Sequence, residues 1–207
     1  MTAIRHRCCL TAVIVVILIS GCSTLSMPGA SVPDNPAWQI RQSELQTVTD
    51  WTLAGRISVI QGDQGWHANL LWEQEDARYR LDLVGPFGQG RVNIEGRGDR
   101  VRMQTADGQI LTADDPETLL AQALDIQLPL NGLRYWIRGL PAPGSDVRPT
   151  IDSEGRLAQL QQDGWQIDYS RYDQVADYQL PVRIRAERNG IIVKLAIQDW
   201  TVDGTDS

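Results

Sequence analysis

Residues 51–72 read WTLAGRISVIQGDQGWHANLLW, and this stretch carries the pattern that decides the fold. On both sides of the turn-forming segment 61–65, large apolar residues alternate with polar or small ones. A period of two places all the apolar side chains on one face of a β-strand. A Gly- and Asp-rich turn between two such runs is typical of a hairpin. The stretch therefore predicts two antiparallel strands with one buried face and one solvated face.

The alternation continues outward from this hairpin and predicts two sets of strands. About ten short strands are expected in all, with the others near 79–83, 92–94, 101–103, 110–111, 157–160, 165–169, 182–186 and 191–200. A single antiparallel sheet of that size has to curl. The chain is therefore expected to be mainly β, with an open, strongly curved antiparallel sheet.

Helices are predicted before the first strand and between the two sets. Asn35-Pro36 is a typical N-cap and first position for a helix that runs to about Thr49. Asp115-Pro116-Glu117 opens a second helix, and a third short one covers 130–137. Short apolar helices between two sets of strands are expected to fill or cover the concave side of the sheet. The Pro- and Gly-rich segment 141–149 is expected to be a loop.

Composition limits the class of protein. The 207 residues are 42% hydrophobic, enough for one domain with its own core. The formal net charge is −7 and Lys194 is the only lysine, so nucleic acid is not expected as a partner. We expect a monomer.

The first 22 residues predict a lipoprotein signal. A basic start at Arg5 and Arg7 precedes the apolar run 10–19, which is too short to cross a bilayer and is typical of a signal peptide. The run ends in Ile-Ser-Gly-Cys at 19–22, which resembles the lipobox of bacterial lipoproteins, so Cys22 is the expected lipidation site. The alternative interpretation is a buried N-terminal hydrophobic strand. Because Ser23 is not the aspartate typical of inner-membrane retention, the lipobox resemblance implies delivery to the periplasmic face of the outer membrane.

The domain organisation follows from this interpretation. Residues 1–21 are the expected signal peptide, 22–35 a lipidated tether rich in Pro, Gly and Ser, and 36–207 a single domain built on the curved sheet. Cleavage would remove two arginines and lower the net charge from −7 to −9. An anionic protein gains nothing from anionic lipid, so the acyl chains have to provide the anchor.

The residues offer little for catalysis. His67 lies on the polar side of its strand and is interpreted as a solvent-facing residue rather than a base. Asp114 and Asp115 form a possible acid pair, but helix capping accounts for Asp115. With Cys22 lipidated, no thiol would remain, and no phosphate-binding motif occurs. We therefore expect neither an enzyme nor a metal or cofactor site.

The apolar residues are the more informative set. Seven tryptophans accompany a single phenylalanine, and tryptophan suits both cavities and ordinary cores. That phenylalanine, Phe87, lies in Gly85-Pro86-Phe87-Gly88, a tight-turn sequence at the end of a strand. An apolar side chain at a turn either folds back onto its sheet or projects into a membrane or an acyl-binding partner.

An ordered series of motifs resembles the LolB family over essentially the whole mature chain. After the lipobox come the segments WTLAGR (51–56), WHANLLW (66–72), YRLDLVGPFG (79–88), TADDPE (112–117), YWIRGLP (135–141), GWQIDY (164–169), LP (180–181) and VKLAIQDW (193–200). Each motif is weakly specific by itself, but their order and spacing are distinctive.

The resemblance implies an incomplete β-barrel around a hydrophobic cavity. It also implies an outer-membrane receptor that accepts the acyl chains of client lipoproteins from the periplasmic carrier LolA and inserts them into the inner leaflet of the outer membrane. In the family an exposed loop leucine is needed for insertion, and Phe87 takes its place here. The expected cavity lining is Trp51, Trp66, Leu70, Trp72, Leu83, Leu120, Leu133, Trp136, Ile137 and Trp165. Two alternatives stay open: a lipid-anchored static scaffold, and a binder of another lipid such as a glycolipid.

Overall fold

The structure, a computed structural model, describes residues 35–202 apart from 89 and 99, and it leaves out the side chain of Phe87. The expected signal peptide, Cys22 and nearly all of the tether lie outside the described residues. Within the described range, no helix combines the length and apolar character that crossing a bilayer requires.

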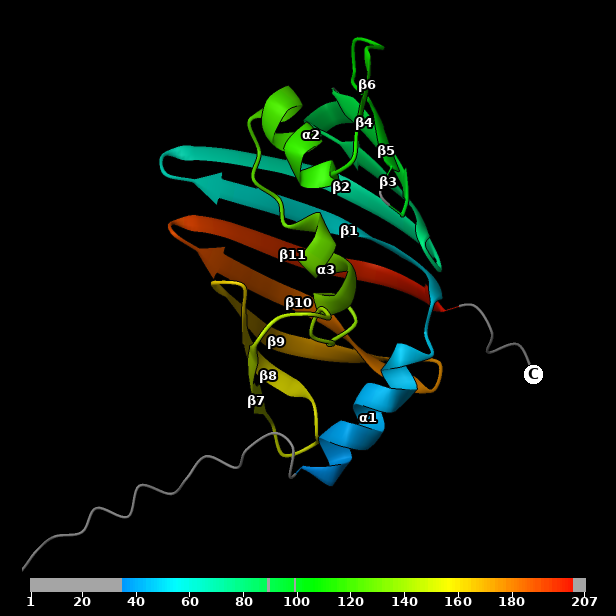
Figure 1. The fold of residues 1–207 in the computed structure, drawn as a ribbon, viewed down its shortest axis with the longest axis vertical. Helices are drawn as coiled ribbons and strands as arrows, with labels where there is room; N and C mark the ends of the chain where they lie inside the picture. The colour runs from blue at the N-terminus through cyan, green and yellow to red at the C-terminus, as the bar shows by residue number, and fades with distance from the viewer. Residues whose placement is uncertain (1–34, 89, 99, 203–207) are drawn as a thin grey trace, which may run out of the picture.

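One antiparallel sheet of eleven strands dominates the described part of the chain (Figure 1). Its order is β6-β5-β4-β3-β2-β1-β11-β10-β9-β8-β7, so β6 and β7 form the two edges and the barrel is not closed. The strands are β1 (Asp50–Gln61), β2 (Gln64–Glu75), β3 (Arg78–Val84), β4 (Arg91–Arg97), β5 (Arg100–Gln104), β6 (Ile110–Ala113), β7 (Val147–Ile151), β8 (Leu157–Gln162), β9 (Trp165–Val175), β10 (Tyr178–Arg188) and β11 (Ile191–Val202). The predicted open, curved, mainly β fold is confirmed.

The sheet consists of two meanders joined at one seam. Strands β1 to β6 follow one another as neighbours, and so do β7 to β11. The seam is the pairing of β1 with β11, in which Trp51 lies opposite Val202 and Ile57 lies opposite Leu195. The first and last strands of the fold therefore lie side by side in the middle of the sheet.

Three helices pack against this sheet: α1 (Pro36–Gln46), α2 (Pro116–Leu124) and α3 (Leu130–Trp136). Figure 1 shows α2 and α3 in front of the concave face, between the two edges. The predicted start of α1 is confirmed, because the Asn35 side chain accepts a hydrogen bond from the Trp38 backbone N–H. The helix ends at Gln46, somewhat before the expected Thr49, since the chain already enters β1 at Asp50.

The predicted loop 141–149 is partly wrong. Its last residues belong to β7, which pairs with β8 and brings the number of strands to eleven rather than about ten. Pro149 made this segment look like a loop, because proline cannot donate a ladder hydrogen bond. At a sheet edge that donor is not needed, which is why edge strands tolerate proline.

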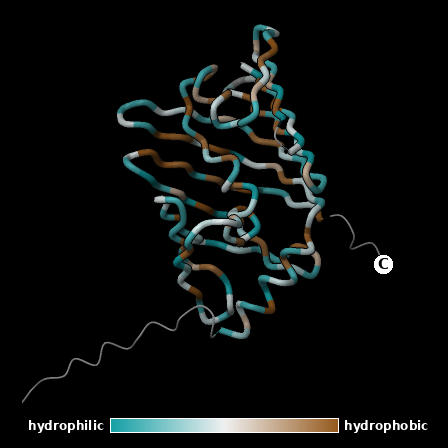
Figure 2. The backbone as a smooth tube through the Cα atoms, viewed as in Figure 1, coloured by the Kyte–Doolittle hydropathy of each residue, from teal (hydrophilic) through white to brown (hydrophobic). Residues whose placement is uncertain are grey.

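Burial alternates along the strands as the sequence predicts. In β2, Ala68, Leu70 and Trp72 are buried while His67 and Asn69 are exposed. Figure 2 shows the same alternation of hydrophobic and hydrophilic residues along the central strands. The core therefore lies between the concave face of the sheet and helices α2 and α3, and the convex face is solvated.

Candidate functional site

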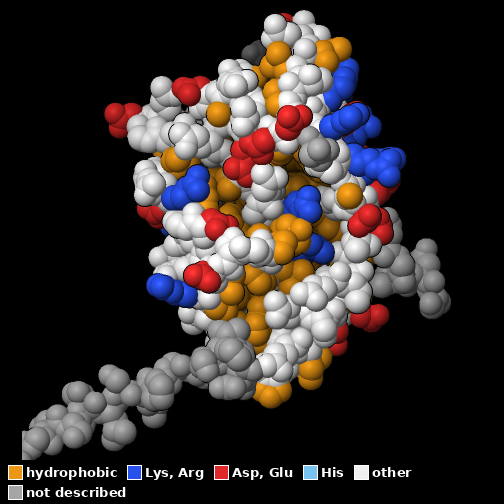
Figure 3. Space-filling view, in the orientation of Figure 1, with side chains coloured by type: hydrophobic (Ala, Val, Ile, Leu, Met, Phe, Trp, Pro, Cys, Tyr) orange, Lys and Arg blue, Asp and Glu red, His pale blue; other side chains and the backbone are white. Residues whose placement is uncertain are grey.

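The residues predicted to line a cavity come together in one apolar core. Nine of the ten are buried and Trp66 is half-buried. The buried ones are Trp51, Leu70, Trp72, Leu83, Leu120, Leu133, Trp136, Ile137 and Trp165. Their side chains themselves fill the interior, so whether they line a cavity for a ligand stays a prediction. Hydrophobic side chains are nevertheless visible from outside, in a hollow around the two helices (Figure 3).

Tryptophans form a cluster at the seam of the sheet. The ring centroids of Trp51 and Trp72 are 5.5 Å apart, and those of Trp51 and Trp200 are 5.4 Å apart. The Trp72 Nε1 donates a hydrogen bond of 3.2 Å to Gln74 Oε1, and Trp200 Nε1 donates one of 3.1 Å to the carbonyl of Pro181. Trp51 Nε1 is buried without a partner among the described residues. Adjacent aromatic pairs of this kind stabilise a core beyond their buried area.

Helix α3 is fixed to the sheet by buried hydrogen bonds. Trp136 Nε1 donates to Gln162 Oε1 at 2.9 Å, and the Tyr169 hydroxyl donates to the Trp136 carbonyl at 3.1 Å. Burial raises the pKa of Tyr169 well above its usual value, so the hydroxyl keeps its proton. A Cβ at Gly132 would lie 2.5 Å from the Trp136 ring, so glycine is required for the ring to lie against its own helix.

Helix α2 is held by exposed polar contacts instead. Glu117 Oε1 accepts a hydrogen bond from the Asn131 backbone N–H at 3.0 Å, which links α2 to the start of α3. Beyond α2, Gln61 at the end of β1 donates to the carbonyl of Asp125 and accepts from the Gln127 N–H. These hydrogen bonds lie at the surface, although the Gln61 and Glu117 side chains are themselves half-buried.

A groove of about 820 Å³ opens beside α2. It lies between the start of β2, the loop that follows β3, the β5–β6 turn and the end of α2. The apolar side chains in it include Trp66, Val92, Leu111 and Leu124. Three of these, Trp66, Leu111 and Leu124, also pack against the core, so the groove leads to the core's edge. The sequence predicted only Trp66, because the other three are ordinary core positions of short elements.

The loop after β3 borders this groove through Gly85 and Pro86. Residues Pro86–Gly88 form a single 3₁₀ turn closed by a hydrogen bond from the Gly88 N–H to the Gly85 carbonyl at 3.2 Å. Gly88 has a φ of +76°, a conformation that glycine adopts without steric cost. The predicted tight turn is confirmed. The direction in which Phe87 points lies outside what the structure describes.

Asp115 has a structural role. Its carboxylate accepts hydrogen bonds from the N–H of Thr118 at 2.9 Å and from Asn131 Nδ2 at 2.9 Å. Burial alone would raise the pKa of Asp115, but hydrogen bonds from Thr118 and Asn131 outweigh it and lower that pKa. The predicted N-cap is confirmed, and His67 is exposed on the convex face as expected. Among the described residues, no group of three or more His, Cys, Asp or Glu side chains is arranged to hold a metal ion.

The open antiparallel sheet with helices in its hollow is a fold that this chain shares with a solved protein of the LolA superfamily. A solved LolA-superfamily protein from Nitrosomonas europaea superimposes with a TM-score of 0.56 over 79% of this chain and 92% of its own length, at 12% sequence identity. At that identity the likeness concerns the fold alone.

The sequence comparisons identify the family. The family model described as "Outer membrane lipoprotein LolB" matches residues 49–200. A relative in Nitrosococcus oceani, named Outer-membrane lipoprotein LolB, is 38% identical over 89% of this chain and 92% of its own length. A relative of the same name in Stutzerimonas stutzeri is 38% identical over 89% and 90% of the two chains. The chain therefore belongs to the LolB family of outer-membrane lipoproteins.

Proposed function

We propose that this protein accepts the acyl chains of lipoproteins from a LolA-like periplasmic carrier and delivers them to the leaflet in which it is anchored. The observation that carries the proposal is the apolar groove between α2 and the Pro86–Gly88 loop, in a chain of the LolB family. The groove offers a path from solvent to the core, and the loop lies at its rim. No cofactor is needed for such a transfer.

The energetics of acyl chains explain why a protein path is required. Each methylene gains about 0.8 kcal/mol on leaving water for an apolar site. The acyl chains of one lipoprotein would therefore cost tens of kcal/mol if exposed together. Escape through water is negligible, so one apolar site has to meet the next. Transfer then proceeds without an energy source if each successive site has a lower free energy.

Helix α2 is the element whose displacement would admit a chain. Leu119 and Leu120 on this helix cover the core, while its polar contacts are exposed and exchangeable with water. Outward movement of α2 would connect the groove with the apolar core and expose the residues predicted to line the cavity. The buried hydrogen bonds of Trp136 keep α3 in place meanwhile.

The lipid anchor, the tether and Phe87 have separate roles in the proposed transfer. Cys22 would carry the lipid anchor, and residues 23–35 would let the domain reach about 20 Å from it. Phe87 would enter the leaflet as an apolar wedge beside the groove. Its side chain is apolar like that of a leucine, so burying it in the acyl layer is favourable.

The test uses the chain from Ser23 onward, which keeps every buried residue of the described range. This protein is mixed with carrier-loaded lipoprotein, and liposomes are added afterwards. We expect the wild type to take lipoprotein from the carrier and release it into liposomes. Phe87→Glu should accept the lipoprotein but fail to release it, because a carboxylate resists entry into lipid. Phe87→Leu is the matched control and should behave as the wild type.

Other outcomes would contradict the proposal. If lipoprotein stays on the carrier in every mixture, the static scaffold takes its place. If a free glycolipid competes with carrier-bound lipoprotein for uptake, the protein binds another class of lipid. A Trp72→Asp variant that folds and still accepts lipoprotein normally would remove Trp72 from the proposed lining.

A further inference from the structure

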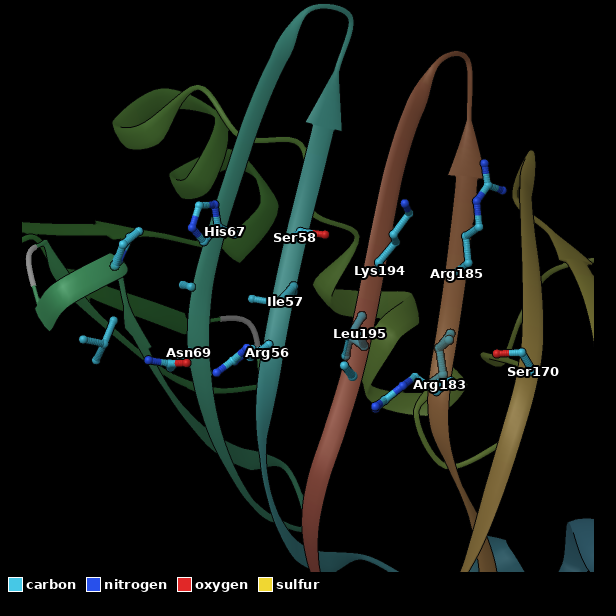
Figure 4. Close-up of a pocket in the computed structure, with 15 residues that line it drawn as sticks. Arg56, Ile57, Ser58, His67, Asn69, Ser170, Arg183, Arg185, Lys194 and Leu195 are labelled. Atoms are coloured by element: carbon cyan, nitrogen blue, oxygen red, sulfur yellow. The ribbon is translucent and has the colours of Figure 1, made fainter.

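The convex face of the sheet carries a hollow of about 680 Å³ that the groove and core do not use (Figure 4). Arg56 on β1, Lys194 on β11 and two arginines of β10, Arg183 and Arg185, line it, with His67 of β2 beside them. The neighbours of these residues along the strands, such as Ile57 and Leu195, are buried in the core. Successive side chains of a strand point to opposite faces, so the cations face away from α2 and α3.

Register explains why a solvated sheet face is hollowed here. Ser58 is paired with Lys194 on one side and with His67 on the other. Ala196 is paired with Arg56 and with Arg183. Two small residues therefore form a floor between longer cationic side chains of the neighbouring strands. We call this site the basic hollow, defined by Arg56, Ser58, Arg183, Lys194 and Ala196.

The charges of the basic hollow are poorly compensated within the described chain. Arg185 pairs with Asp168 at 3.9 Å and with Glu187. By contrast, no carboxylate of the described residues lies within ion-pair distance of Arg56, Arg183 or Lys194. Arg183 instead donates to the carbonyls of Val182 and Ile197, which holds its guanidinium over β11. A cluster of three unpaired cations in a chain of net charge −7 indicates an external anion.

The location of the basic hollow favours lipid headgroups as that anion. Pro86 lines both the basic hollow and the apolar groove, so the loop proposed to enter the leaflet separates the two. Phosphates of a bilayer are the anions nearest to a loop that has entered it. Among the described residues, no aromatic side chain apart from His67 lines the hollow, whereas the centre of a protein interface is enriched in aromatic residues. The three cations are also exposed, which suits a headgroup layer better than one small bound ion.

We propose that the basic hollow binds phosphate groups of anionic phospholipids and thereby orients the domain on the leaflet. This inference rests on the proposed function, because it takes the Pro86–Gly88 loop as the element that enters lipid. A tether of Pro, Gly and Ser residues at Cys22 would limit the distance of the domain from the membrane but would not set its orientation. Headgroup binding would turn the loop and the groove beside it toward the leaflet despite the negative charge of the whole chain.

Two double variants of equal charge change test the proposal. Arg56→Glu/Lys194→Glu alters the basic hollow. Arg97→Glu/Arg100→Glu is the matched control, because these two exposed arginines face each other at the β4–β5 turn, at the far end of β4 from the loop. The chain from Ser23 onward is floated with vesicles of equal parts phosphatidylcholine and phosphatidylglycerol, and with vesicles of phosphatidylcholine alone.

We expect the change in the basic hollow to lower partitioning onto the phosphatidylglycerol vesicles at least about tenfold, and the control to lower it less than about twofold. On phosphatidylcholine alone, both variants should match the wild type. Added salt should abolish the difference between wild type and the hollow variant. Arg56→Gln/Lys194→Gln, which removes the charges without reversing them, should lower partitioning by a smaller factor than the reversal does. This variant controls for misfolding of Arg56→Glu/Lys194→Glu.

Several results would overturn the proposal. Equal losses in the hollow variant and the control would mean that only net charge matters, and no loss would mean that the hollow does not meet lipid. Competition by millimolar inorganic phosphate would indicate a site for a free ion. A hollow variant that binds vesicles normally but no longer takes lipoprotein from the carrier would assign this face to an acidic protein partner.

Acceptance of lipoprotein from the carrier is measured separately, without vesicles, and both variants should accept it as the wild type does. If the wild type itself accepts none, the proposed function fails, while the contrast in vesicle binding remains measurable by itself.

Discussion

Helices α2 and α3 cover the same concave face, yet they are attached in opposite ways. Each buries two leucines against the sheet, Leu119 and Leu120 in α2 and Leu130 and Leu133 in α3. Helix α3 has buried hydrogen bonds to the sheet, such as the one between Trp136 and Gln162, besides the exposed bonds of Asn131 to α2. Those that tie α2 and the segment after it lie at the surface, where water can replace them.

The difference teaches which part of the core can open. Parts of a protein unfold locally with different free energies, and the elements that move in binding come from the least stable parts. Breaking a buried hydrogen bond leaves groups without any partner, whereas an exposed one is replaced by water at little cost. The interior should therefore open by release of α2 while α3 stays docked.

The largest effect is expected from removing equivalent leucines, Leu133→Ala and Leu120→Ala, both of which have no exposed surface. A rigid site cannot collapse around the cavity, so Leu133→Ala should lower the free energy of unfolding by about 4 kcal/mol. At Leu120, a helix free to shift should reduce the loss to about 2 kcal/mol. Urea denaturation measures both. Equal losses would contradict the difference between the two helices.

Gln162→Met tests the anchor of α3 directly. The Gln162 amide accepts from Trp136 Nε1 and the Ala142 N–H and donates to the Ala142 carbonyl. Methionine fills the space but leaves these buried groups unpaired, so stability should fall by roughly 3 kcal/mol. Gln161→Met, at the exposed neighbour, should cost less than about 0.5 kcal/mol. A small loss at Gln162 would mean that α3 is held by packing alone.

Gln61→Ala should increase local opening of α2 without affecting α3. The variant loses the two hydrogen bonds that tie the segment after α2 to the end of β1. Overall stability should fall by less than about 1 kcal/mol, because both bonds are exposed. Amide exchange in α2 should nevertheless become about fivefold faster, while exchange in α3 stays unchanged. Gln64→Ala, at the paired position of the same hairpin, is the control. Equal acceleration in both helices would show that they open together.

The smallest effect concerns the pH dependence of α2 docking. Burial raises the pKa of Glu117 above its ordinary value of 4.5, partly offset by the hydrogen bond from Asn131. The folded state then binds more protons than the unfolded state above that value, so stability should increase as pH falls from neutrality toward 4.5. Asp115 works in the opposite direction, but only near and below its ordinary pKa of 3.8.

Glu117→Gln keeps the acceptor for Asn131 and removes this titration. The variant should be more stable than the wild type near pH 7, by less than about 1 kcal/mol because the site is partly exposed. The two should converge as pH approaches 4.5. Thermal denaturation across this range measures the effect, with the exposed Glu73→Gln as control. A variant less stable than the wild type at neutral pH would contradict the assignment.

Local signals in the sequence predicted the parts of the fold that depend on neighbouring residues. The alternation from Trp51 to Trp72, the caps at Asn35 and Asp115 and the turn at Gly88 each depend on a few adjacent positions. All of these features except the Asn35 cap lie in the motifs that resemble the LolB family, and the comparisons confirm that family.

What the sequence did not predict depends on partners far along the chain. Gln162 looks like a surface residue of β8 until Trp136, 26 positions earlier, is placed beside it. Strand β7 was missed because only its position at a sheet edge makes Pro149 acceptable. The basic hollow depends on which residues stand opposite Ser58 and Ala196, and register is not readable from either strand alone.

The seam between β1 and β11 has a consequence for how the protein is made. During export the chain emerges from its N-terminus, so strands β1 to β6 can pair with one another before β11, the second partner of β1, has emerged. The edge of β1 stays open until the last dozen residues of the sheet arrive, and an open apolar strand edge is prone to wrong pairing. A protein proposed to shield the acyl chains of other proteins from water therefore exposes an unpaired strand edge of its own while it folds. The time at which β11 pairs with β1 decides how long that edge stays exposed.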